Sequence, residues 1–275
     1  MIGQSSILTI IDEQIMLDEF PRFSIIVGPE GSGKKTLSNA IAMALNAHRV
    51  FVEPKVDAVR DMIHNAYEVG DTTLYVLLDG FMSESAKNAM LKICEETPKN
   101  AYICMLTTDI STVLDTLRSR AGIYFMQPYT PDEILEYANV VDGKEEEIIV
   151  DLCETPGDVD KLLFTGVYKF YDFVEKVVDS IADVSPANAL KIVDKLDVKN
   201  NDAEKYDVTL FLRAFKAVCG NRMRKAVAED DVESQLWYSA GIKVVTHTLQ
   251  QMQITGINKS ALLDIFILDC RRVWS

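Results

Sequence analysis

The chain has 275 residues, of which 48% are hydrophobic, and carries a formal net charge of −14. This length allows two or three domains with substantial buried cores. The acidic balance argues against a protein that grips nucleic acid over a broad surface. We find no apolar run long enough for a membrane span and no signal-peptide pattern, so we expect a cytoplasmic protein without a membrane partner.

The five cysteines are far apart and form no C-x-x-C pair. Such spacing is typical of neither a zinc site nor a disulfide framework. We therefore expect buried thiols in a reducing compartment, and no bound zinc. The cysteines are Cys94, Cys104, Cys153, Cys219 and Cys270.

Residues 1–128 alternate short β-type runs with helical patterns, which predicts a five-stranded parallel sheet with helices on both faces. Ligands of such sheets bind at the carboxyl ends of the strands. The predicted strands are residues 23–27, 49–52, 74–78, 102–107 and 123–125. The helices predicted between them are residues 37–45, 56–67, 84–96 and 111–117.

The most informative stretch joins the first predicted strand to the first predicted helix. Seven of the eight positions of G-x-x-x-x-G-K-[ST] match in a strand–turn–helix context, which predicts a phosphate-binding loop. Glycines let the backbone approach an anion closely, and the start of the next helix attracts it. An ordinary glycine turn is the alternative. The predicted nucleotide-binding residues are Gly28, Pro29, Glu30, Gly31, Ser32, Gly33, Lys34, Lys35 and Thr36.

The eighth position of the pattern departs from it. Lys35 stands where a Ser or Thr hydroxyl should hold Mg²⁺. Thr36 is a poor substitute, because the next residue of a helix points about 100° away. We therefore expect at most weak ATP binding, with Lys34 facing phosphate and with little dependence on Mg²⁺.

The third predicted strand ends in Asp79, where a phosphate-loop protein places an aspartate near Mg²⁺. An Asp at a strand end is also a common turn residue. Gly80 follows where hydrolysing proteins of this kind commonly have a water-activating glutamate, and it has no side chain for that role. On the helix at 84–96, Lys87 and Lys92 are predicted on a solvated face in preference to a DNA contact.

From residue 129 the pattern becomes helical. Residues 129–184 predict a small helical domain, with helices starting near residues 130, 144 and 159. Residues 185–275 predict a helical bundle. Its aromatic residues Trp237, Tyr238, Phe266 and Trp274 are predicted as core or subunit-contact residues. The helices expected in the bundle are residues 187–196, 208–219, 234–251 and 259–273.

Several motifs resemble bacterial clamp-loader subunits of the AAA+ class. Residues 79–83, 86–92 and 95–98 look like the family's central segment, a run such as Asn-Ala-Leu-Leu-Lys followed by Glu-Glu-Pro. Residues 105–109 are similar to its sensor-1 strand and include Thr108. Residues 117–121 resemble its serine-arginine-cysteine motif, with Ala121 in place of the cysteine. The resemblance spans residues 1 to about 165, and residues 185–275 match only as a helical tail of suitable length.

Within that family the chain looks most like the delta-prime branch of DNA polymerase III, or a phage or mobile-element counterpart. Lys35 and Gly80 favour that branch over the motor subunits, as does the absence of a sensor-2 arginine from residues 155–158. The four-cysteine zinc module of many delta-prime subunits is missing from residues 46–73.

The resemblance implies an AAA+ domain at 1–128, a helical lid at 129–184 and a collar at 185–275. It implies a non-hydrolysing part of a clamp loader, whose partners are other ATPase subunits, the sliding clamp and, through the complex, primed DNA. Thr108 would contact nucleotide, and Arg120 would act in trans as an arginine finger. The alternatives are an active ATPase or a stand-alone nucleotide-sensing scaffold, and for Arg120 a surface ion pair with a carboxylate such as Asp115.

Overall fold

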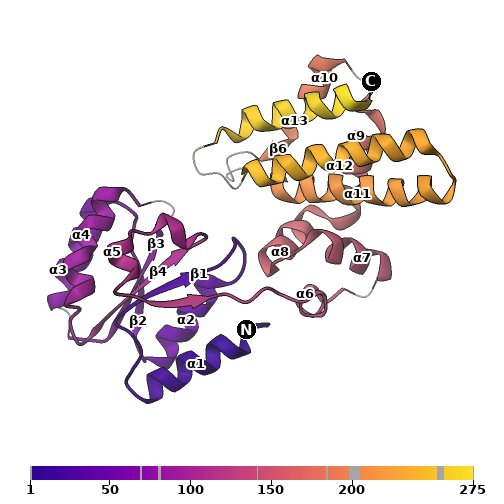
Figure 1. Ribbon diagram of the computed structural model, residues 1–275. Helices are drawn as coiled ribbons and strands as arrows, with labels where there is room; N and C mark the ends of the chain where they lie inside the picture. The colour runs from indigo at the N-terminus through magenta and orange to yellow at the C-terminus, as the bar shows by residue number, and fades with distance from the viewer. Residues whose placement is uncertain are drawn as a thin grey trace. The chain divides into compact units, whose positions relative to one another are not determined.

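The computed structural model describes residues 2–68, 70–79, 82–140, 142–183, 185–197, 205–252 and 257–274. The chain divides into two compact units, and Figure 1 shows the elements of each. The first comprises Met1–Glu133 and Thr155–Gly157, and the second Ile134–Glu154 and Asp158–Ser275. The division into an AAA+ domain, a lid and a collar stays a prediction.

A five-stranded parallel sheet in the order β2-β3-β4-β1-β5 forms the centre of the first unit. Every predicted strand is confirmed to within one residue at each end. Val27 at the end of β1 pairs with Thr107 of β4 and with Phe125 of β5, so these carboxyl ends share one edge. The strands are β1 Phe23–Val27, β2 His48–Phe51, β3 Thr73–Leu78, β4 Ala101–Thr107 and β5 Gly122–Phe125.

Helices cover both faces of this sheet (Figure 1). Helices α3, α4 and α5 pack on one face, and α1 and α2 on the other. The sequence did not predict α1. The helix predicted at 111–117 is instead a 3₁₀ turn, Ile110–Thr112, and a one-turn helix, because Val113 between them is extended. The helices are α1 Ser5–Met16, α2 Lys34–Ala44, α3 Val56–Glu68, α4 Glu84–Glu95 and α5 Asp115–Arg118.

Alternate residues of the strands fill two separate cores. Ile25 of β1 and Ile103 of β4 lie in the core that contains Met90 of α4. Their neighbours Ile26 and Cys104 lie in the core under α1 and α2. A parallel sheet covered on both faces needs such nearly continuous apolar strands.

The chain from residue 131 onward is mainly helical, and helix α9 in it was not predicted. The prediction of a helix over 187–196 was wrong in its second half. After α10 the chain forms a 3₁₀ turn, Val193–Lys195, and a short strand β6, Leu196–Asp197, which pairs in parallel with β7, Tyr206–Asp207. Two β-branched residues and an aspartate at 192–194 make that stretch a weak helix former. The helices are α6 Pro131–Ala138, α7 Gly143–Leu152, α8 Pro156–Thr165, α9 Val167–Ser180, α10 Pro186–Leu190, α11 Val208–Ala228, α12 Val232–Met252 and α13 Lys259–Trp274.

The three long C-terminal helices share an aromatic core. Trp274 of α13 is buried and stacks on Phe215 of α11, with ring centroids 5.7 Å apart. Phe266 lies 5.1 Å from Phe215, also by ring centroids. Burial confirms the core role predicted for Trp274 and Phe266, whereas Trp237 is 42% exposed. All five cysteines are buried, as predicted. In the part of the chain that the structure describes, every helix is too short or too polar to cross a bilayer.

Candidate functional site

The glycine loop connects β1 to α2 at the carboxyl edge of the sheet. Its first N–H group, on Gly28, donates to the carbonyl oxygen of Thr107 at 3.1 Å, so the loop continues the sheet. Gly31 and Gly33 have φ angles of +77° and +87°, a conformation that favours glycine. A Cβ atom on Gly28 would lie 2.6 Å from Cγ of Met126. The strand–turn–helix context predicted from the sequence is therefore present.

Lys34 is the first residue of α2, and its side chain folds back over the loop. Its Nζ atom donates to the carbonyl oxygens of Gly28 at 2.6 Å and Pro29 at 2.7 Å. Burial lowers the pKa of Lys34 to about 8, with Glu30 opposing this shift and Lys35 adding to it. These bonds use two of the three N–H donors of the ammonium, so a phosphate would share Lys34 with the loop.

The remaining loop residues divide by exposure. Pro29, Glu30, Lys35 and Thr36 are exposed. Ser32 is buried; its hydroxyl donates to the carbonyl oxygen of Pro29 at 2.8 Å. The carbonyl oxygen of Ser32 accepts from the hydroxyl of Tyr129 at 2.9 Å. Lys35 and Thr36 therefore face solvent, and among the described residues no contact gives Thr36 the role of the missing hydroxyl.

A later segment of the first unit packs on the glycine loop. The N–H group of Gly157 donates to the carbonyl oxygen of Gly31 at 3.1 Å. A Cβ atom on Gly157 would lie 2.5 Å from Cα of Gly31, and one on Gly31 would lie 2.6 Å from Oγ1 of Thr155. This segment therefore contacts the loop mainly through the backbones of Gly31 and Gly157.

Asp79 directly follows β3 and is buried, with 1% of the residue exposed. The Nζ atom of Lys87, from α4, lies 2.7 Å from its Oδ1 atom. Lys87 is itself buried at 8% exposure, so the prediction of a solvated lysine at this position was wrong. Lys92 on the same helix is exposed, as predicted. Gly80, the predicted replacement for a water-activating glutamate, lies outside the described residues.

Two threonines complete the surroundings of Asp79. The hydroxyl of Thr112 donates to Oδ2 of Asp79 at 2.6 Å, and the hydroxyl of Thr107 lies 3.3 Å from the same oxygen. Both hydroxyls also lie within 2.9 Å of the carbonyl oxygen of Asp109, and each has one proton to donate. Sequence reasoning selected Thr108, which is exposed, and missed Thr107 and Thr112. Thr107 could have been predicted from the sequence, because it ends the strand that follows β3 and the carboxyl ends of parallel strands lie together.

Metal-ligating side chains do not gather at this site. Among the described residues, no group of three His, Cys, Asp or Glu side chains could hold a metal ion. The charged residues of the loop are Glu30, Lys34 and Lys35, and Lys87 lies on Asp79. The arrangement can attract an anion through Lys34 and the start of α2. The carboxylate of Asp79 is buried and paired with Lys87.

Arg120 follows the short helix α5 and keeps 34% of its side chain exposed. Its guanidinium forms an ion pair with Glu95, from the end of α4, and donates to the carbonyl oxygen of Thr116 at 2.6 Å. Asp115, the carboxylate suggested by the sequence, pairs with Arg118 instead. The two arginines of this segment therefore have different partners.

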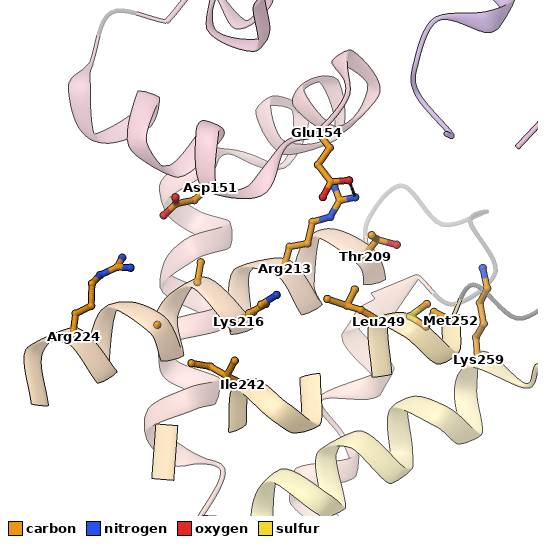
Figure 2. Close-up of a pocket in the computed structure, with 12 residues that line it drawn as sticks. Asp151, Glu154, Thr209, Arg213, Lys216, Arg224, Ile242, Leu249, Met252 and Lys259 are labelled. Atoms are coloured by element: carbon orange, nitrogen blue, oxygen red, sulfur yellow. Dashed lines mark hydrogen bonds and ion pairs between the residues drawn. The ribbon is translucent and has the colours of Figure 1, made fainter. Parts of the chain in front are cut away.

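The second unit contains a cavity of about 580 Å³ (Figure 2). Arg213 on its wall pairs with Glu154 at 2.6 Å and with the buried Asp158 at 2.8 Å, measured from guanidinium nitrogen to carboxylate oxygen. None of the predicted site residues lines this cavity. Four basic and two acidic side chains line the cavity, and this mixture does not define a ligand. The lining residues are Asp151, Glu154, Thr209, Arg213, Lys216, Ala217, Gly220, Arg224, Ile242, Leu249, Met252 and Lys259.

The sheet order, the glycine loop and the following helices define an AAA+ type of fold, as the sequence predicted. This fold is shared with a DNA polymerase III gamma subunit-related protein of Thermotoga maritima, at a TM-score of 0.53 and 17% identity, over 98% of this chain and 99% of that one. Such low identity supports the fold alone.

Sequence comparison adds the family resemblance. The model of the family described as DNA polymerase III, delta subunit, matches residues 54–130, a segment with Asp79 and Arg120 but without the glycine loop. The DNA polymerase III subunit gamma/tau of Mycoplasma genitalium is 24% identical over 84% of this chain and 41% of its own length. Replication factor C subunit 3 of Schizosaccharomyces pombe is 26% identical over 49% of this chain and 43% of its own length. The chain thus spans less than half the length of these relatives, and its resemblance to clamp-loader subunits is confirmed.

Proposed function

We propose that this chain is a non-hydrolysing, delta-prime-like subunit of a DNA polymerase III type of clamp loader. In the cytoplasm it assembles with ATPase subunits that load a sliding clamp on primed DNA, and it supplies Arg120 to the ATP site of a neighbouring subunit. The AAA+ fold and the similarity to gamma/tau and replication factor C subunits support this reading. Its domains would be the predicted AAA+ module, lid and collar.

The observation that carries the proposal is the contrast between Arg120 and the chain's own loop. Arg120 is partly exposed in the segment that resembles the family's serine-arginine motif. The loop meanwhile has Lys35 where a metal-binding hydroxyl belongs, so ATP is bound weakly at most and Mg²⁺ has no ligand there. An arginine finger without a competent site of its own serves a nucleotide on another subunit.

The ion pair with Glu95 is compatible with this role. Exposed ion pairs contribute roughly 0–1 kcal/mol, so the contact holds the guanidinium in place without binding it strongly. An arginine that reaches a γ-phosphate stabilises charge in the transition state and contributes about 10³–10⁵ in rate. In the transition state this contribution is larger than that of an exposed ion pair, so the contact with Glu95 does not oppose the proposed role.

The test is Arg120→Ala in the complex reconstituted with its ATPase subunits. We expect assembly to survive and the turnover of the neighbouring site to fall by about 10³-fold, because the transition-state charge loses its partner. Pre-steady-state measurement of clamp- and DNA-stimulated phosphate release would report this loss. Unchanged release would make Arg120 a structural residue only.

Two variants serve as controls. Arg118→Ala removes a neighbouring arginine whose ion pair is with Asp115, and it should leave turnover intact. Glu95→Gln removes the ion pair but keeps Arg120, so it should also leave turnover intact. If Glu95→Gln reproduced the defect of Arg120→Ala, the ion pair and not the finger would be the function of Arg120.

A further inference from the structure

The buried pair of Asp79 and Lys87 stands where a phosphate-loop protein would use a metal ion. We propose that Lys87 is an internal cation that takes the place of a divalent metal at Asp79, so that this site is built to work without Mg²⁺. The inference deepens, and rests on, the non-hydrolysing role proposed above. Its test uses the chain alone, so it can fail without the clamp-loader assignment failing.

Charge compensation at Asp79 is complete without a metal. Its side chain is 0% exposed, and the Lys87 ammonium lies 2.7 Å from Oδ1. Oδ2 accepts the hydroxyl of Thr112 at 2.6 Å. Among the described residues Oδ1 accepts no well-aligned hydrogen bond, so the ion pair is what compensates this oxygen. A buried carboxylate is costly unless it has such a partner.

The residues around Asp79 do not fit Mg²⁺. This ion demands octahedral coordination and usually keeps several waters, so it needs a carboxylate oxygen that a hydrated ion can reach. Neither oxygen of Asp79 is reachable, because the side chain is fully buried and an ammonium already lies on Oδ1. Lys35 adds a positive charge at the position of the other expected ligand, and like charge repels a cation.

Packing of α4 sets the position of Lys87. The helix begins after Ser83, whose hydroxyl oxygen accepts the N–H group of Ala86 at 3.3 Å. Lys87 shares an i, i+3, i+7 flank with Met90 and Cys94, which are buried. Its ammonium also donates to the carbonyl oxygen of Thr112 at 2.8 Å. The lysine is therefore held at Asp79 by its helix and by a second hydrogen bond.

The experiment is hydrogen exchange of the isolated chain, followed by mass spectrometry on peptides from α4 and β4. The variants are Lys87→Met, Asp79→Asn and the double variant, and Lys92→Met on the exposed side of α4 is the matched control. Each is measured with and without millimolar Mg²⁺ and ATP. Local exchange reports the opening equilibrium of this part of the fold.

We expect Lys87→Met to raise the local opening constant by roughly 10²- to 10³-fold, because it leaves a buried carboxylate alone. Lys92→Met should change it by no more than about twofold. In the double variant the local opening constant should rise by much less than the product of the two single-variant increases, because neither buried charge remains. If Lys87→Met does not fold, the double variant is compared with Asp79→Asn instead. The double variant should then have the smaller opening constant, because Asp79→Asn leaves the buried ammonium of Lys87 without its partner.

Mg²⁺ gives an independent readout. The wild-type chain should exchange equally with and without Mg²⁺, in the presence or absence of ATP. Protection of wild type by Mg²⁺ that disappears in Asp79→Asn would show a metal at Asp79 and overturn the proposal. A Lys87→Met variant that behaves like Lys92→Met, or single effects that simply multiply in the double variant, would overturn it as well.

Discussion

Replacement of Gly241 by alanine tests the packing of the C-terminal helices, because this mid-helix glycine lies against Trp274. A Cβ atom on Gly241 would lie 2.6 Å from Cζ2 and 3.3 Å from Cε2 of the indole. The indole has little freedom to move. Its N–H group donates to the carbonyl oxygen of Trp237 at 2.6 Å, and its ring stacks on Phe215.

Two opposing effects decide whether Gly241→Ala raises or lowers the free energy of unfolding. Exchange of glycine for alanine inside a helix stabilises by roughly 0.5–1 kcal/mol where there is space. Overpacking of a core costs about 1–3 kcal/mol. We therefore expect a net loss of about 1–2 kcal/mol in the free energy of unfolding. Gly220→Ala is the matched control, because Gly220 also lies inside a 21-residue helix and a Cβ atom there would have nothing within 4 Å.

The assay is urea unfolding followed by tryptophan emission. The chain has two tryptophans, and both lie in the second unit, so the signal reports that unit alone. Gly220→Ala should raise the midpoint and Gly241→Ala should lower it. A gain in stability for Gly241→Ala, or shifts of the same sign in both variants, would refute the packing described for Trp274.

Two further predictions concern the glycine loop. The isolated wild-type chain should show no ATP turnover in a phosphate-release assay; turnover that Lys34→Ala abolishes would contradict this. The pKa of Lys34, about 8 in the folded chain against an ordinary value of 10.5, means that its charge destabilises the fold fully below pH 8. This penalty is relieved as the pH rises from 8 to 10.5. In thermal unfolding followed by circular dichroism, the stability of wild type relative to Lys34→Met should therefore increase from pH 8 to 10.5. Equal pH profiles of the two proteins would disprove the lowered pKa of Lys34.

The sequence was sufficient for the sheet and the loop because their signals are local. Apolar runs such as Phe23–Val27 are buried on both faces of the sheet, so a short continuous apolar run was enough to predict each strand. Helix α1 was missed although Ile7 and Ile11 have helical spacing, because Gln4 before it makes no side-chain cap and its first turn has no acidic residue. Helix α9 was missed although its buried residues follow a helical stripe, since β-branched valines dominate that stripe.

The site was less predictable, because its contacts join distant parts of the chain. Lys87 lies on the border of an apolar stripe, and only the fold brings it to the end of β3, where Asp79 is buried. Thr112 comes from a 3₁₀ turn that the sequence suggested as part of a longer helix. Arg120 is partly exposed, but its partner Glu95 comes from another helix and could not be chosen over Asp115 by spacing.

The most direct test of the central claim is capture of the chain, at native abundance, from the cell that makes it. The bound proteins would be identified and quantified by mass spectrometry. The account predicts that ATPase subunits of a clamp loader co-purify in a fixed ratio to this chain and remain bound at moderate salt. Recovery of the chain without any such subunit, from cells in which the clamp loader is intact, would contradict it.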